Sequence, residues 1–149
     1  MSSLPVREAA RAVVLDADLR VLLLRYPENG GFWATAGGSL EPDEDYPAAV
    51  LRELREEVGA EKVDLDGQIA ERVQEHPVSG QQVRQVERYF LVHASADGID
   101  PSRASQPDTI RSSRWWTLAE LHSSTETVDP LGLAELLAHG TPRSPVILH

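Results

Sequence analysis

The sequence contains no cysteine among its 149 residues. Disulfide bonds, zinc–thiolate centres and thiol nucleophiles are therefore excluded. Long apolar runs are also missing, because a run such as Val21–Leu24 is far shorter than the ~20 residues that a membrane-spanning helix needs. The first ten residues lack the apolar segment of a signal peptide. We therefore expect a cytoplasmic protein with no membrane partner.

Basic residues are scarce relative to acidic ones. The chain has 24 Asp and Glu against 14 Lys and Arg, which gives a formal net charge of −10. A field of this sign repels duplex nucleic acid, so we do not expect such a partner. A small phosphorylated substrate stays compatible with the charge, because bound divalent cations reverse the local field.

Several common catalytic motifs are absent too. The sequence has no G-x-S-x-G elbow, no Walker loop and no nicotinamide fingerprint. Its histidines show no metal-ligand spacing; they are His76, His93, His122, His139 and His149. We therefore assign none of them a role.

The order of β-rich and helical segments predicts an α+β fold in a single domain over residues 1–149, with a core over roughly 8–140. The turn residues Ala36-Gly37-Gly38 predict that regular secondary structure is interrupted there. The polar stretch 97–113 predicts a functional loop. The expected strands are 9–15, 20–25, 32–35, 69–74, 83–94 and 114–117, and the expected helices are 46–58, 118–121 and 130–139. The tail 144–149 is ambiguous.

One of these helices has clear end signals. Asp45 is suited to cap its first turn and Gly59 to end it, so the helix is expected over Tyr46–Val58. Spacing along the helix predicts one apolar stripe, made of Pro47, Val50, Leu51, Leu54 and Val58.

Three glutamates gather beside that stripe. Glu53, Glu56 and Glu57 are spaced i, i+3, i+4, and Arg52 lies one turn before Glu56. Like charges at this spacing cost a few tenths of a kcal/mol each, roughly. A hard cation such as Mg²⁺ relieves this repulsion, and two ions about 4 Å apart clamp a phosphoryl displacement. The alternative is an ordinary solvated, ion-paired helix face.

The loop before the helix favours the metal interpretation. Gly37 and Gly38 permit close approach of a ligand to the backbone, so a carbonyl there is a candidate oxygen ligand. Glu44 is placed to pair with Arg52 and so to lock the loop to the helix.

The whole segment resembles the Nudix family signature, G-x5-E-x7-R-E-U-x-E-E-x-G-U, where U is a bulky apolar residue. All seven fixed positions match; they are Gly38, Glu44, Arg52, Glu53, Glu56, Glu57 and Gly59. Leu54 is a bulky apolar residue, as the pattern requires, whereas the small Ala60 departs from the pattern at its last position. Weaker similarity in the opening hairpin and around the tryptophans extends the resemblance to roughly residues 8–122.

The resemblance implies an α/β/α sandwich with a mixed β-sheet between helices. It also implies Mg²⁺- or Mn²⁺-dependent hydrolysis of a nucleoside diphosphate linked to another moiety, by attack of water on phosphorus. The implied metal ligands are Glu53, Glu56, Glu57 and the carbonyl of Gly37, and Glu53 is also a candidate base. Arg52 would hold the glutamates, and Glu44, Gly38 and Gly59 would shape the loop and the helix end.

Substrate contacts are less defined. Arg11 and Arg25 are candidates for phosphate binding, and the aromatic candidates for stacking on a base are Tyr26, Phe32, Trp33 and Tyr89. Some family members take an extra acid from a later loop. Asp108 is the nearest acid there, and Glu87 is a second candidate for which an outward-facing strand side chain is the favoured interpretation.

The substrate itself stays open between a nucleoside triphosphate, ADP-ribose or a nucleotide sugar, and a dinucleoside polyphosphate. A catalytically silent nucleotide-sensing or protein-binding module is the alternative function, although every glutamate of the Nudix signature (the Nudix box) is present. A structural Ca²⁺ site is disfavoured because the EF-hand pattern is absent. A homodimer is compatible with the resemblance.

Overall fold

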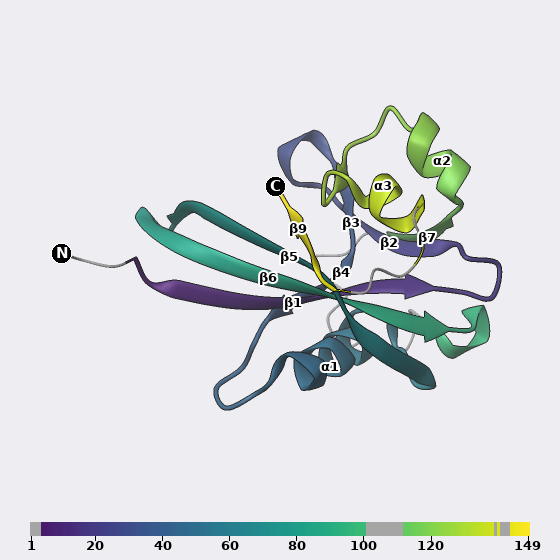
Figure 1. Ribbon diagram of the computed structural model, residues 1–149, viewed down its shortest axis with the longest axis horizontal. Helices are drawn as coiled ribbons and strands as arrows, with labels where there is room; N and C mark the ends of the chain where they lie inside the picture. Colours follow the sequence, from purple (N-terminus) through teal and green to yellow (C-terminus); the bar gives the residue numbers. More distant parts are fainter. Residues whose placement is uncertain (1–3, 101–111, 139, 141–143) are drawn as a thin grey trace.

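A curled β-sheet forms the middle layer of the molecule, with helices on both sides (Figure 1). The computed structural model describes residues 4–100, 112–138, 140 and 144–149. Its strands are β1 (Val6–Leu15), β2 (Val21–Tyr26), β3 (Phe32–Ala34), β4 (Ala36–Ser39), β5 (Val63–Val78), β6 (Gln81–Ala94), β7 (Ser112–Trp116), β8 (Val128–Asp129) and β9 (Val146–Leu148). The helices are α1 (Tyr46–Val58), α2 (Leu118–Ser123) and α3 (Leu133–Ala138), with 3-10 turns at Glu28–Gly30 and Ala96–Gly98.

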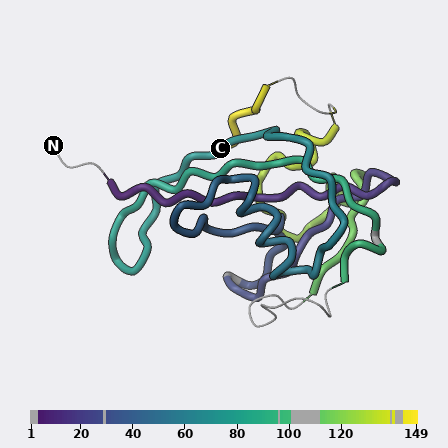
Figure 2. The backbone as a smooth tube through the Cα atoms, turned by 90° about the horizontal axis from the view of Figure 1, so that it is seen from below, coloured from purple at the N-terminus to yellow at the C-terminus, as the bar shows by residue number. Residues whose placement is uncertain are grey.

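The strand order is β8-β3-β2-β1-β6-β5-β9, while β4 pairs with β1 and β7 pairs with β2. The pairs β1–β6, β3–β8 and β5–β9 are parallel, and the other pairs are antiparallel. The mixed sheet confirms the predicted α+β fold. The turn of the long β5–β6 hairpin projects at the same end of the molecule as the start of β1 in two perpendicular views (Figures 1 and 2).

Two hydrophobic cores occupy the two faces of the sheet. Val14 on β1 packs with Val50 and Leu54 of α1, whereas Val13 packs with Leu133 and Leu136 of α3. Successive strand side chains point to opposite faces, so β1 needs apolar residues at consecutive positions in its central part. None of the helices in the described part of the chain is long and apolar enough to cross a membrane.

Helix α1 has the predicted bounds and the predicted caps. The Asp45 side chain accepts a hydrogen bond of 2.8 Å from the amide of Ala48. Gly59 ends the helix in the left-handed conformation, with φ of 62°. The expected apolar stripe was wrong at Pro47, which is exposed, and Tyr46 and Ala49 are buried in its place.

The predicted break at Ala36–Gly38 was wrong. This segment belongs to β4, which pairs with residues 9–12 of β1. Gly37 has φ of 146°, and a Cβ atom there would collide with the carbonyl oxygen of Ala10. The glycine is therefore what lets the strand approach β1, rather than what interrupts it.

The other differences lie at element ends. Pro77 falls between the expected strands 69–74 and 83–94, where a loop was predicted, but it belongs to β5. The turn consists of Ser79 and Gly80 alone, with φ of 52° and 81°. Pro77 lies beyond residues 70–72, where β5 pairs with β9. The N–H that proline lacks therefore removes no hydrogen bond between β5 and β9. Helix α3 starts at Leu133 rather than 130, after Pro130 and Gly132. The ambiguous tail supplies β9, and the two-residue β8 was not predicted.

Replacing Asp45 by alanine tests the N-terminal cap of α1. We expect Asp45→Ala to lower the free energy of unfolding by about 1 kcal/mol, because the first turn loses its side-chain acceptor. Asp45→Asn is the control, since asparagine caps about as well. Urea denaturation measures both variants. Equal stability of Asp45→Ala and the unmodified protein would show that the cap contributes nothing.

Candidate active site

On the side of the sheet that carries α1, the Arg52 side chain joins β4, the loop of residues 40–45 and α1. Its Nε and Nη2 atoms donate to the two carboxylate oxygens of Glu44, at 2.7 and 2.8 Å. Nη2 also donates to the carbonyl of Ser39 at 3.0 Å, and Nη1 donates to Glu53 at 3.0 Å and Glu56 at 3.2 Å. The predicted pairing of Glu44 with Arg52 is confirmed. One guanidinium thus fixes β4, the loop and α1 to one another.

Glu44 is locked from both sides. Its carboxylate also accepts the amide of Glu41 at 2.9 Å. The hydrogen bonds from Arg52, and after them the one from the Glu41 amide, hold the pKa of Glu44 at about 2. The carboxylate therefore stays ionised, as the bidentate pair requires.

Glu57 takes a different place, under the edge of β4. Its Oε1 accepts the amide of Gly37 at 2.8 Å, and the Tyr26 hydroxyl lies 3.5 Å from its Oε2. Only 8% of Glu57 is exposed. Burial raises the pKa of Glu57 to about 8, against the hydrogen bond from Gly37, and the neighbouring Glu53 adds to the rise. This buried carboxylate lacks a nearby countercharge strong enough to offset its desolvation.

Glu53 lies against Gly38, the second glycine of β4. A Cβ atom on Gly38 would be 2.5 Å from Glu53 Oε1. Glycine at this position therefore makes room for the carboxylate to rest on the backbone. Burial raises the pKa of Glu53, while its bond to Arg52 opposes the rise.

The three carboxylates suit a hard divalent cation. Within the described ranges, no group of three or more His, Asp or Glu is arranged to hold a metal ion, and Arg52 and the Gly37 amide bond to oxygens of the three glutamates. Oxygens of Glu53 and Glu56 nevertheless converge on one nitrogen of Arg52. Together with the carboxyl group of Glu57, they supply only oxygen donors, the kind that Mg²⁺ and Mn²⁺ prefer. The residues therefore fit such an ion.

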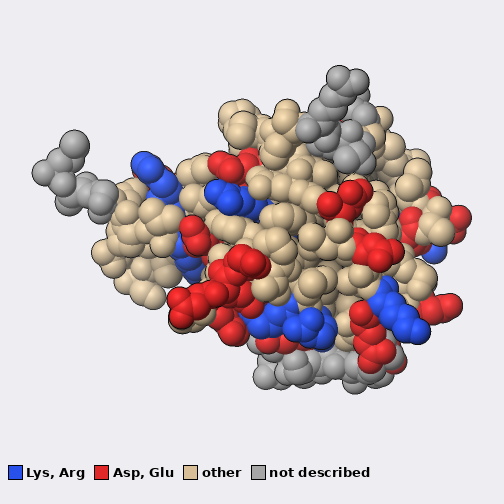
Figure 3. All heavy atoms as spheres, turned by 60° about the horizontal axis from the view of Figure 1, so that its bottom comes forward, with Lys and Arg blue, Asp and Glu red and all other residues tan. Residues whose placement is uncertain are grey.

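A groove of about 910 Å³ opens next to Glu57 and Gly37. Tyr26 and Phe32 stack on each other in its wall, with ring centroids 5.3 Å apart. Arginine and carboxylate side chains line it as well; they are Arg11, Glu28, Arg72, Glu87 and Asp129. The surface that carries α1 shows groups of acidic side chains with basic ones between them (Figure 3).

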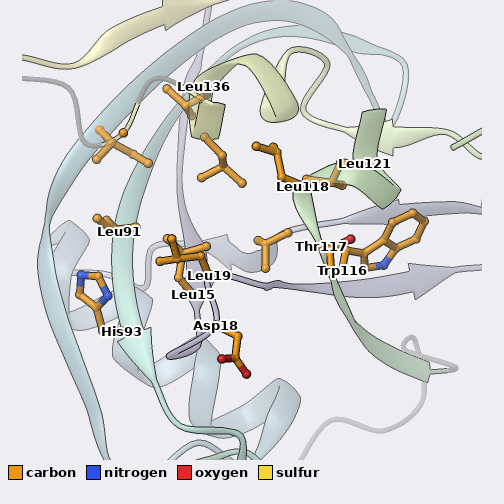
Figure 4. A pocket seen from close by; sticks show the side chains of 14 residues that line it. Leu15, Asp18, Leu19, Leu91, His93, Trp116, Thr117, Leu118, Leu121 and Leu136 are labelled. Atoms are coloured by element: carbon orange, nitrogen blue, oxygen red, sulfur yellow. The ribbon is translucent and has the colours of Figure 1, made fainter. Parts of the chain in front are cut away.

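A second cavity, of about 310 Å³, has the opposite character. It lies between the sheet and helices α2 and α3, and leucines converge on it (Figure 4). Asp18, His93 and Thr117 are the polar residues among the side chains that line it. It offers no cluster of oxygen donors, so the groove is the candidate active site.

The predicted substrate contacts separate in the structure. Arg11 lines the groove. Arg25 does not line it, and its guanidinium lies over Gly31. Trp33 is 7% exposed and packs edge-on against Trp116 in the core below α3, so it is not placed to stack on a ligand in the groove. Tyr89 is fully buried in the same core, and Asp108 lies outside the described residues.

Sequence reasoning missed the charged residues at the bottom of the groove. Glu87 was interpreted as an outward-facing side chain, which was wrong, because it has 0% exposure. Arg72 and Asp129 were not identified, although both bond within the groove. The available signal was a charged residue within each expected strand, Arg72 in 69–74 and Glu87 in 83–94. Which residues they pair with depends on the strand register, which the sequence does not specify.

The chain belongs to the Nudix family, because the family model for the NUDIX domain matches residues 5–138. It is similar to the CTP pyrophosphohydrolase of Escherichia coli (strain K12), with 43% identity over 53 residues, 34% of this chain and 39% of that protein. It is also similar to the RNA pyrophosphohydrolase of Gluconacetobacter diazotrophicus, with 36% identity over 74 residues and 44% of each chain. These matches span less than half of either relative.

Solved structures agree on the fold. The structure is similar to that of the MutT protein from Methanosarcina mazei Go1, with a TM-score of 0.67 and 20% identity over 93% of this chain and 95% of that chain. At this level of identity the likeness establishes the Nudix fold.

Removal of Arg52 tests its central structural role. We expect Arg52→Ala to lower the free energy of unfolding by about 2 kcal/mol, because it leaves three partly buried carboxylates without their partner. Arg55→Ala is the control on the same helix, where the side chain is exposed, and should change stability by less than about 0.5 kcal/mol. Chemical denaturation compares the two. Similar losses in both variants would contradict the assignment.

Proposed function

We propose that the protein hydrolyses a nucleoside diphosphate linked to another moiety, with Mg²⁺ or Mn²⁺ as cofactor and water attacking phosphorus. The observation that carries the proposal is Glu57, which the Gly37 amide holds in the lining of a groove large enough for a nucleotide, with Glu53 and Glu56 held by Arg52 on the same helix. Membership of the Nudix family and the pyrophosphohydrolase names of the similar proteins support it.

In this proposal Glu53, Glu56 and Glu57 hold the metal together with the Gly37 carbonyl. A bound divalent ion neutralises phosphate charge and lowers the pKa of a coordinated water. Arg52 is a positioning residue, since its bonds to Glu53 and Glu56 set where the oxygens lie. Glu53 is the candidate base that accepts a proton from the attacking water, because it is a carboxylate largely shielded from solvent.

The groove suits the nucleoside part of the substrate. Tyr26 and Phe32 are partly exposed and stacked, so they offer an aromatic surface for a base. Arg11 lines the same groove as these rings and Glu57, so it is available to bind a phosphate there. A small-molecule nucleotide is therefore the proposed partner. The cytoplasmic location and the homodimer stay predictions.

The relatives' names favour a nucleoside triphosphate or a triphosphate-ended nucleotide within this class. One acts, by its name, on CTP, another on RNA, and a third is named 8-oxo-dGTP diphosphatase, from Proteus vulgaris. A silent binding module has less support, because every box glutamate is present and fixed in place.

Turnover of a substrate panel tests the proposal. The panel holds nucleoside triphosphates, 8-oxo-dGTP, ADP-ribose, nucleotide sugars, diadenosine polyphosphates and 5′-triphosphate RNA, each with Mg²⁺, Mn²⁺ or EDTA. We expect cleavage of one class, abolished by EDTA and reduced at least about 100-fold in Glu56→Gln. Glu135→Gln, on exposed α3 surface, should be unaffected. Metal-independent turnover, or none by the folded protein, would reject the proposal.

Gly38→Ala tests the glutamate geometry without removing a carboxylate. Gly38 is outside the left-handed region, so alanine fits its backbone, but the new Cβ displaces the Glu53 carboxylate. We expect kcat to fall about 100-fold, as misplaced groups cost in other enzymes. The melting temperature should stay within about 2 °C of the unmodified protein's.

Gly67→Ala is the matched control, because a Cβ there meets no atom within 4 Å. It should keep full activity. If Gly38→Ala also keeps full activity, the Glu53 position inferred from the structure does not matter for the reaction.

A further inference from the structure

Four charged side chains form a continuous ion-pair chain along the groove. Glu87 accepts Arg11 Nε at 2.9 Å on one oxygen and Arg72 Nε at 2.8 Å on the other. Arg72 then donates its Nη1 and Nη2 atoms to the two oxygens of Asp129, at 3.0 and 3.1 Å. Both oxygens of Glu87 are therefore occupied by guanidinium groups.

Strand register explains why these residues meet. Arg72 on β5 is the direct partner of Glu87 on β6. On the other side Glu87 pairs with Ala9 of β1, and Arg11, two residues further on, points to the same face. Arg11 also lies against β4 directly before the Nudix signature, since a Cβ on Gly37 would be 2.9 Å from Arg11 Cδ. The ion-pair chain thus begins beside the glutamates.

Stability alone is a weak explanation for this arrangement. Glu87 has 0% exposure and Arg72 5%, so both charges have lost most of their hydration. Well-packed apolar residues in place of a buried ion pair are often as stable or more stable. Elsewhere on the same face the strands do carry apolar residues, such as Val13 and Leu91. A requirement other than stability therefore accounts for charge at these positions.

Arg11 has donors left for a ligand. Within the described part of the chain its hydrogen bond uses Nε, and its side chain is 23% exposed toward the groove. Burial lowers the pKa of Arg11, but the ion pair with Glu87 outweighs this and leaves the pKa raised. The guanidinium is thus a fixed cation whose Nη1 and Nη2 can bind anionic oxygens in bidentate fashion.

We propose that Glu87 is a positioning residue for substrate binding: it holds Arg11 beside the box glutamates so that the Arg11 Nη atoms bind a phosphate of the nucleotide. This inference rests on the proposed function and adds to it a phosphate contact outside the Nudix box. Glu87 is neither base nor metal ligand in this role, because Arg11 and Arg72 occupy its oxygens.

Steady-state kinetics on the substrate identified by the panel tests the role. We expect Arg11→Gln and Glu87→Gln each to raise KM about 10-fold, with kcat changed less than about threefold, since a charge-assisted hydrogen bond is lost or misaligned. The double variant should match Arg11→Gln alone, because both changes remove one interaction. Arg11→Lys should recover part of the KM. Glu71→Gln, on the opposite face of β5, is the control.

Affinity for an α,β-methylene nucleotide with Mg²⁺, measured by calorimetry, separates this inference from the proposed function. If the unmodified protein binds the analogue but does not turn over the panel, the proposed hydrolysis fails, whereas a 10-fold loss of affinity in Arg11→Gln still supports the phosphate contact. Unchanged affinity and KM in Arg11→Gln overturn it. Additive effects in the double variant, or a lower kcat with unchanged KM in Glu87→Gln, show that Glu87 acts structurally only. Arg11→Gln remains decisive should Glu87→Gln fail to fold.

Discussion

The site depends on the bonds of a single guanidinium. Arg52 bonds the carboxylate of Glu44 in bidentate fashion and also reaches the Ser39 carbonyl, Glu53 and Glu56. It ties the loop of residues 40–45, β4 and α1 to one another and holds the neighbouring carboxylates of Glu53 and Glu56 together, and the bond from the Gly37 amide to Glu57 adds a second link between β4 and α1. Charges of one sign gathered on a helix repel one another, so their proximity needs a fixed cation on the protein side.

The two glycines of β4, Gly37 and Gly38, make the complementary contribution. Gly37 lets β4 lie close to β1 and gives its amide to Glu57, and Gly38 leaves space for the Glu53 carboxylate. A site that needs carboxylates near the backbone therefore needs residues without side chains opposite them. On the groove side, Glu87 does for Arg11 what Arg52 does for the glutamates: it fixes a flexible charged group by pairing it with an opposite charge.

Local signals predicted most of the box and much of the fold. Asp45 and Gly59 gave correct ends for α1, and the spacing of Glu44 and Arg52 gave a correct pair. Contacts between distant segments were not predictable, because a lone sequence does not specify strand register. Glu87 meets Arg72 through the β5–β6 register, and Trp33 packs edge-on against Trp116, which β7 brings from a distant part of the chain. A two-residue strand such as β8 carries no periodicity to detect.

Titration with Mn²⁺ tests the central claim, that the box glutamates form a binding site for a divalent cation. Calorimetry on the unmodified protein and on Glu57→Gln, both checked for folding, measures the affinity directly. The account predicts saturable binding that weakens at least about 10-fold in the variant. Equal affinity in the two proteins, or no saturable binding to the unmodified protein, would contradict it.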